Sequence, residues 1–168
     1  FFFKQKTAYE ISTRDWSSDV CSSDLGGTNT IAGAATVTTV SGGTTTVGGT
    51  ATLTTVSNGT LNLNGTSASV ATLNGGTIAL GSTALTVNAG TFAGVISGAN
   101  GSLTKASSGT LTLSGANTYA GATLVSAGTL TAASGALAGT SGITVNGATL
   151  TAASRWTDRK STRLNSSH

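Results

Sequence analysis

Three consecutive stretches of the sequence repeat almost column by column. They read ATVTTVSGGTTTVGGT (35–50), ATLTTVSNGTLNLNGT (51–66) and ASVATLNGGTIALGST (68–83). The aligned columns are Val37/Leu53/Val70, Val40/Val56/Leu73, Gly43/Gly59/Gly76, Thr44/Thr60/Thr77 and Val47/Leu63/Leu80, at intervals of 16 or 17 residues. Self-similarity at a short fixed period is typical of a solenoid, in which each repeat forms one coil and stacks on the next.

Each repeat has the composition of two short strands joined by tight corners. Aliphatic residues alternate with small polar ones, as at Leu61 and Leu63, and this period of two predicts strands with one buried face. Asn58-Gly59, Asn64-Gly65 and Asn74-Gly75 mark the corners, because Gly and Asn tolerate positive φ. Like residues at a fixed interval favour parallel stacking over a meander of hairpins. We therefore predict an all-β fold, a parallel β-helix or β-solenoid.

The period lengthens after Ala84. A Gly-Thr-apolar unit recurs at Gly90-Thr91-Phe92, Gly109-Thr110-Leu111 and Gly128-Thr129-Leu130, the last two being 19 residues apart, and Gly147 opens one more, imperfect unit. We expect coils of about 16–19 residues along the whole repeat region.

The two ends have a different composition from the middle. Lys105 is the single charged residue between Gly26 and Ser154. All the acidic residues lie outside this segment, at Glu10, Asp15, Asp19, Asp24 and Asp158, and so do the remaining bases, at Lys4, Lys6, Arg14, Arg155, Arg159, Lys160 and Arg163. One fold does not account for both compositions.

The terminal segments resemble translated sequencing-adapter DNA. Phe1–Ile11 matches a flow-cell primer, Arg14–Leu25 matches the adjoining read adapter, and Asp158–His168 matches the reverse complement of that adapter in a shifted frame. We predict three segments: 1–25 and 155–168 as adapter-derived artefacts, and 26–154 as the β-solenoid. The terminal Cys21, His168 and basic residues are therefore not read as a metal site or a nucleic-acid surface.

One part of the middle resembles a known repeat. ISGANGSLTK (96–105), GTLTLSGANTYAG (109–121) and VSAGTL (125–130) are similar to the autotransporter-associated β-strand repeat. The matching positions are Lys105, Leu111, Leu113, Asn117, Tyr119, Gly121 and Thr123. Ala106-Ser107-Ser108 replaces a turn in which the family usually has Gly, which is expected to loosen that turn and spare the strands.

The resemblance implies a right-handed β-helix in the passenger region of an autotransporter. Such a passenger crosses the outer membrane and is displayed on the bacterial cell surface or outside the cell, and the full-length protein carries an outer-membrane β-barrel. The family shares no catalytic residues, so none is assigned to this chain.

The residue content argues against an enzyme. General acid–base catalysis requires titratable side chains at the substrate, and the middle of the chain offers Lys105 alone, which we expect to be an exposed turn residue. The glycines follow the coil period and form no phosphate loop, and calcium-binding repeats would require Asp. We expect no catalytic, cofactor-binding or metal site, no cofactor and no nucleic-acid partner.

The expected function is a structural stalk or adhesin scaffold. The alternative is a ligand-binding solenoid that recognises a host-surface or glycan ligand or self-associates, or one that binds ice through the threonine rows Thr36/Thr38, Thr52/Thr54 and Thr44/Thr60/Thr77. Tyr119 is expected to pack at a coil corner rather than bind a ligand. The sequons at Asn58, Asn64 and Asn100 are interpreted as turns.

Overall fold

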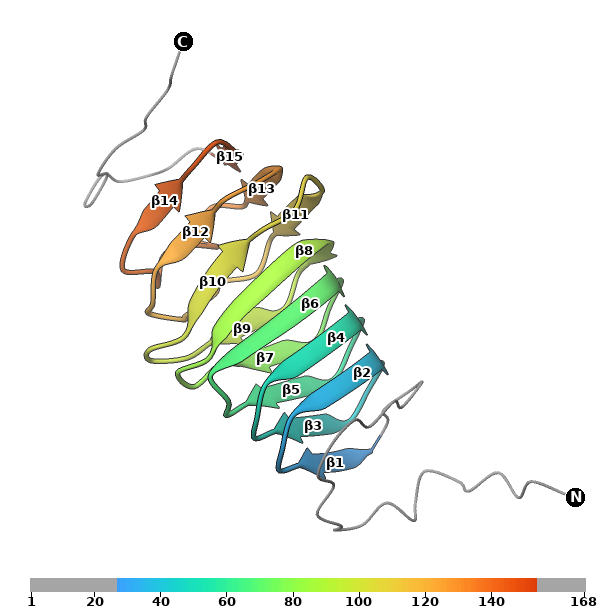
Figure 1. Ribbon diagram of the computed structural model, residues 1–168. Coiled ribbons are helices and arrows are strands. Elements are labelled where there is room, and N and C mark those ends of the chain that lie inside the picture. Colours follow the sequence, from blue (N-terminus) through green and yellow to red (C-terminus); the bar gives the residue numbers. More distant parts are fainter. Residues whose placement is uncertain (1–26, 154–168) are drawn as a thin grey trace, which may run out of the picture.

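The computed structural model describes residues 27–153, which form a stack of parallel strands with no helix among them (Figure 1). The strands are β1 (Thr28–Ile31), β2 (Ala35–Val40), β3 (Thr44–Val47), β4 (Ala51–Val56), β5 (Thr60–Leu63), β6 (Ser67–Leu73), β7 (Thr77–Ala79), β8 (Ala84–Phe92), β9 (Val95–Ser97), β10 (Ser102–Lys105), β11 (Thr110–Leu113), β12 (Thr123–Val125), β13 (Thr129–Ala132), β14 (Ile143–Val145) and β15 (Thr149–Ala152). The predicted segments 1–25 and 155–168, with Cys21 and His168, lie outside the described residues.

The strands form three faces that wind around one core. Face B is the five-stranded sheet β1-β3-β5-β7-β9. Face A contains β2, β4, β6, β8, β10, β12 and β14, and face C contains the end of β8 with β11, β13 and β15. Within each face, every strand pairing is parallel and links a strand to its counterpart in the next coil. The predicted all-β parallel solenoid is confirmed, with about seven turns; its right-handed sense stays a prediction.

The sequence columns are confirmed as structural columns in the first half of the stack. Ala35 pairs with Ala51, which pairs with Ala68. On face B, Thr44, Thr60 and Thr77 are successive partners. Like residues align because a parallel ladder places equivalent positions of neighbouring coils above one another.

The register after Ala84 differs from the sequence alignment. Gly90 pairs with Leu111, and Phe92 with Leu113, so the unit at Gly90 is offset by two positions from the one at Gly109. The reason is that β8 runs without a break through the corner between faces A and C, whereas residues 106–109 form a turn there in the next coil. The later alignments are confirmed, because Thr110 pairs with Thr129, and Thr129 pairs with Thr149 of the imperfect last unit.

The coils lengthen along the stack. Partner residues lie 16 positions apart at Thr28 and Thr44, and 20 positions apart at Thr123 and Ile143. This exceeds the expected upper value of 19, because residues 114–122 and 133–142 take an irregular path where the earlier coils have a face B strand.

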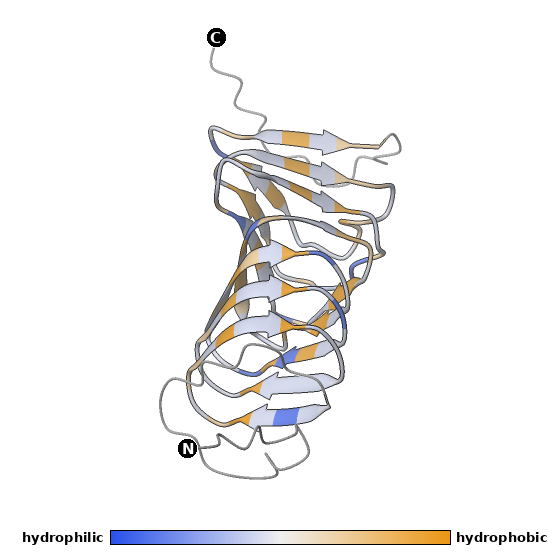
Figure 2. Ribbon diagram, turned by 90° about the vertical axis from the view of Figure 1, so that its right-hand side faces the viewer, coloured by the Kyte–Doolittle hydropathy of each residue, from blue (hydrophilic) through white to orange (hydrophobic). Residues whose placement is uncertain are grey.

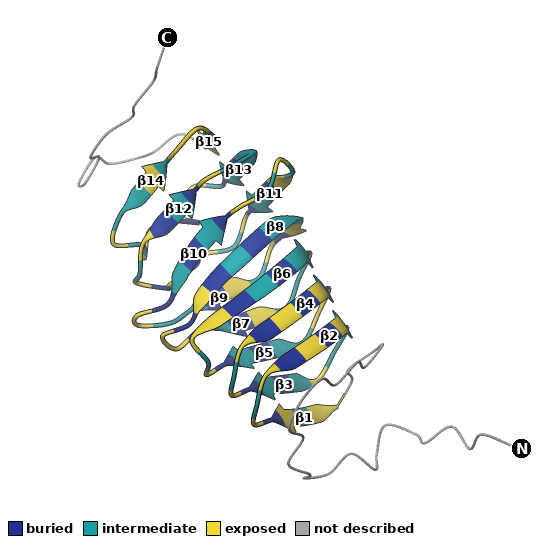
Figure 3. Ribbon diagram, viewed as in Figure 1, coloured by how far each residue is buried: buried dark blue, intermediate teal, exposed yellow. Residues whose placement is uncertain are grey.

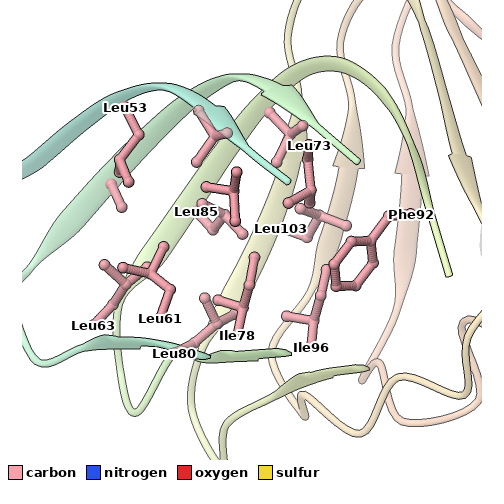
Figure 4. Close-up of a cluster of buried hydrophobic side chains, with 14 of the residues drawn as sticks. Leu53, Leu61, Leu63, Leu73, Ile78, Leu80, Leu85, Phe92, Ile96 and Leu103 are labelled. Carbon is pink, nitrogen blue, oxygen red and sulfur yellow. The ribbon is translucent and has the colours of Figure 1, made fainter. Parts of the chain in front are cut away.

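The core is a continuous column of aliphatic side chains along the stack axis. In β5 and β11 the inward residues are buried and the outward residues are partly or fully exposed (Figure 3). Leu61, Leu63, Ile78 and Leu80 project from one side toward Leu85 on the other (Figure 4). Colouring by hydropathy shows the same bands repeating from strand to strand (Figure 2). Each coil thus shares its buried surface with the coils on both sides.

Glycine is required where the corners of successive coils meet. Gly43, Gly59 and Gly76 have φ values of 62°, 83° and 91°, a region that other residues rarely adopt. A Cβ on Gly59 would lie 2.7 Å from the carbonyl carbon of Gly42 in the coil before. The glycine column that repeats in the sequence therefore reflects both the backbone conformation of the corners and their close stacking.

Two buried threonines, Thr45 and Thr83, differ in whether their hydroxyl groups find a hydrogen-bond partner. The Thr83 hydroxyl donates to the carbonyl oxygens of Leu63 (3.2 Å) and Gly65 (2.8 Å). The Thr45 hydroxyl is equally buried and has no hydrogen-bond partner. Thr45 stands in a column with Leu61, so its hydroxyl lies at a position that an aliphatic side chain fills in the next coil.

We predict that Thr45→Val raises the free energy of unfolding by about 1 kcal/mol, because it removes an unpaired buried hydroxyl and keeps the side-chain shape. Thr83→Val is the matched control and should lower it by about 1 kcal/mol. Urea unfolding followed by circular dichroism measures both. Equal losses in the two variants would contradict the prediction.

Candidate functional site

Lys105 is the single charged side chain in the described segment, so the search for chemistry begins there. Within residues 27–153 no group of three or more His, Cys, Asp or Glu side chains could hold a metal ion. No helix in the same residues is long and apolar enough to cross a membrane.

The structure corrects the expected placement of Lys105. The residue lies in β10 and is fully buried rather than exposed in a turn. It occupies an inward column in which its partners are Val87 and Val125. The alternation of β10 turns Leu103 and Lys105 inward together, and this alternation decides the direction of the side chain.

The Lys105 ammonium binds the backbone at the corner between faces A and C. Nζ donates to the carbonyl oxygen of Ser107 in the same coil and to that of Ala127 in the next coil, at 3.3 Å. The Ser107 hydroxyl donates to the carbonyl of Asn88 in the preceding coil at 2.7 Å. Burial lowers the pKa of Lys105. Lys105 and Ser107 together tie three corners to one another, and the buried Lys105 side chain has no free surface for a substrate.

These contacts also explain the departure at Ala106-Ser107-Ser108 from the usual repeat. The strands on either side, β10 and β11, are both formed. The expected loosening of the turn is not seen, because the Ser107 hydroxyl donates to the Asn88 carbonyl and the Ser107 carbonyl accepts from Lys105. The expectation that the strands are spared is confirmed.

Asn117 bridges three coils where the regular strands of face B stop. Its Oδ1 accepts from the backbone N–H of Ile96 in β9, and its Nδ2 donates to the carbonyl of Ala136, both at 2.8 Å. The Asn117 side chain is 2% exposed. It therefore supplies the hydrogen bonds that a strand would otherwise make at this place.

Tyr119 packs inside the same irregular region, as expected. It is fully buried, and its hydroxyl lies 2.6 Å from Thr123 Oγ1. Thr123 donates to Thr140 Oγ1 at 3.0 Å, and Thr140 donates to the Gly121 carbonyl at 2.8 Å. Because each hydroxyl carries one proton, Tyr119 is the donor to Thr123. Burial raises the pKa of Tyr119 to about 12.

The outer surface carries hydroxyl rows, some predicted and some missed. Thr36 pairs with Thr52 on face A, and both are exposed. The row continues in register through Ser69, Thr86 and Thr104, is interrupted at Leu124, and resumes at Thr144. Thr38 and Thr54 are also exposed, next to this row.

A second hydroxyl array lies on face C and was not predicted. It consists of the pairs Thr110/Thr112, Thr129/Thr131 and Thr149/Thr151 in register on three successive coils. The signal was present in the sequence as three Thr-x-Thr triplets. The sequence alignment already placed Thr110 and Thr129 in one column, but the predicted hydroxyl rows came from the first three repeats alone.

Comparison with known proteins yields one match. A family model described as a passenger-associated transport repeat matches residues 103–132. No curated protein and no solved structure gives a significant match. The matched segment contains Lys105, Asn117, Tyr119 and Thr123, so the resemblance to the autotransporter passenger repeat is confirmed for this part of the chain. This repeat family implies a secreted, cell-surface location.

We predict that Lys105→Glu lowers the free energy of unfolding by about 3 kcal/mol or more, because a buried carboxylate would face the carbonyl oxygens of Ser107 and Ala127. Lys105→Met keeps the length of the side chain without its charge and should have a much smaller effect. Urea unfolding of both variants measures the difference. A change below about 0.5 kcal/mol for Lys105→Glu is typical of an exposed residue and would contradict the buried placement.

A second prediction concerns the alkaline limit of stability. The folded-state pKa of Tyr119 is about 12, above its ordinary value of 10.0. The unfolded chain therefore loses this proton first, and the stabilisation present below pH 10 should disappear as the pH rises toward 12.

Tyr119→Phe is the variant that tests this. It should lower the free energy of unfolding by about 1 kcal/mol at neutral pH, through loss of the bond to Thr123, and should show a smaller decline above pH 10. Unfolding curves across this pH range measure both effects. An identical decline in wild type and variant would show that Tyr119 is not the group responsible.

Proposed function

We propose that this solenoid is a structural segment of an autotransporter passenger that serves as a stalk or adhesin scaffold on the bacterial surface. The observation that carries the proposal is the passenger-associated transport repeat at residues 103–132, set within an unbroken stack of parallel coils. The described segment has one charged side chain, which is buried and bonded to backbone. This residue content favours a mechanical role over a catalytic one.

Stacking of similar coils builds a long structure from a small set of residue types. Neighbouring strands in a sheet are about 4.8 Å apart, so about seven coils extend roughly 30 Å along the axis. Each added coil pairs with the previous one through backbone hydrogen bonds and shares its core. Coils can therefore form one after another as a chain emerges from the outer membrane, and their stacking carries a neighbouring binding region away from the cell.

A second candidate function is ligand binding by the outer faces. The Thr-x-Thr pairs on face C form a regular array of hydroxyl groups in register on three coils. An uncharged hydroxyl array of this kind fits a glycan, or the ordered water of an ice surface. A second copy of this chain, bound through the same face, is the third candidate ligand.

Surface display in a Gram-negative host tests the proposal. The full chain is placed between a signal peptide and the translocator of an unrelated autotransporter. We expect it to reach the cell surface and to resist added protease across residues 27–153, because stacked coils shield the backbone. Asn117→Leu is the matched variant: it removes the bridge to Ile96 and Ala136 and should make the displayed chain protease-sensitive around residues 114–142.

Retention of the wild-type chain inside the cell, or its complete digestion at the surface, would refute the scaffold proposal. The same displaying cells distinguish the two candidate functions. A scaffold alone causes no adhesion to glycan-coated surfaces, no clumping and no change in ice growth. Any of these effects, abolished by Thr131→Tyr on face C, would favour ligand binding instead.

A further inference from the structure

Five Asn-Gly dipeptides lie at the corners of the solenoid, beginning at Asn58, Asn64, Asn74, Asn100 and Asn146. All five asparagine side chains are exposed. Among the described residues, none of these side-chain amides makes a hydrogen bond with the protein. A solvated asparagine followed by glycine is the local sequence in which the next backbone nitrogen reaches the side-chain carbonyl most easily, because glycine has no Cβ to obstruct it.

We propose that the Asn-Gly corners are sites of spontaneous deamidation, with Asn58 reactive in the folded chain and Asn74 protected. The backbone nitrogen of the glycine attacks the asparagine Cγ and loses its proton. The side-chain nitrogen leaves as ammonia, and a cyclic imide forms. Water then opens the ring at either carbonyl and leaves aspartate or isoaspartate. The reaction consumes one water, releases one ammonia and requires no enzyme, oxidant or metal.

The difference between Asn58 and Asn74 comes from the backbone hydrogen bonds at one corner. The Gly75 N–H, which would have to attack Asn74, donates to the Val56 carbonyl at 3.4 Å. The Gly59 N–H, which would attack Asn58, has no acceptor among the described residues. An N–H engaged with a carbonyl must break that bond before it can act as a nucleophile, whereas a free one need not.

Among the described residues, the Gly75 N–H is bonded and the Gly59 N–H is not, because the two Asn-Gly pairs stand at different positions in their coils. Asn58 N–H donates to the Val40 carbonyl in the same way that Gly75 N–H donates to the Val56 carbonyl, each at 3.4 Å. Asn58 and Gly75 are therefore equivalent positions, and Asn74 stands one position earlier in its coil than Asn58 does. Because of this displacement, the nitrogen that would attack Asn74, which is that of Gly75, donates a hydrogen bond to the Val56 carbonyl.

Deamidation would alter both the charge and the backbone of the solenoid. Each deamidation adds a carboxylate to the surface of residues 27–153, a segment whose one charged residue before the reaction is Lys105. Isoaspartate also inserts an extra backbone carbon, at a corner where a Cβ on Gly59 would already lie 2.7 Å from Gly42. The Asn58 corner therefore gains negative charge and loses close stacking with time, a property that does not depend on the proposed function.

The test compares folded and unfolded protein. The purified 168-residue chain is kept in mildly alkaline buffer, with and without guanidinium chloride, and deamidation at each site is followed over weeks by peptide mapping with mass spectrometry. In the unfolded chain Asn58 and Asn74 should react at comparable rates, since each precedes a glycine. In the folded chain Asn58 should react several-fold faster than Asn74.

Matched variants confirm the source of the acidic product. Asn58→Gln should remove a major acidic species from the ion-exchange profile of aged folded protein, because closure of a larger ring is slower. Asn74→Gln should leave that profile unchanged. Equal rates at Asn58 and Asn74 in the folded chain, or no reaction at Asn58, would overturn the proposal.

Discussion

Parallel hydrogen bonding between neighbouring coils is the interaction on which the rest of this structure depends. Because each strand pairs with the equivalent strand of the next coil, equivalent residues must stand above one another. An inward position is then inward in every coil, and a corner must tolerate another corner directly beside it. The aliphatic columns of the core and the glycine column at Gly43, Gly59 and Gly76 both follow from this single constraint.

Where the backbone ladder stops, polar side chains continue it. Face B ends at β9, and beyond it Asn117 joins Ile96 to Ala136 while Tyr119, Thr123 and Thr140 form a buried hydroxyl chain. These groups lie at or next to the segment that matches the passenger-associated transport repeat. The recognisable residues of the repeat thus do the work of a missing strand: they satisfy buried backbone groups that regular pairing leaves open.

Stacking also restricts which residue types occur on the surface of the coils. A solenoid that relies on stacking needs small residues at its corners and β-branched or short polar residues on its outer faces, and it needs no ion pairs. Lys105, the single lysine within residues 27–153, is buried, and its ammonium binds the carbonyl oxygens of Ser107 and Ala127. The outer faces of residues 27–153 therefore carry no charged side chain and display rows of threonine hydroxyl groups.

The sequence by itself determined the strand positions, the parallel stacking and the register as far as Ala84, because a column of like residues is the direct consequence of a parallel ladder. It also predicted the packed position of Tyr119. The burial of Lys105 and the partners of Asn117 were decided only by the tertiary structure. Once the interval between partner residues varies between 16 and 21 positions, periodicity alone no longer says which residues are neighbours. From there the three-dimensional path of each corner decides which side chains point inward and what they meet.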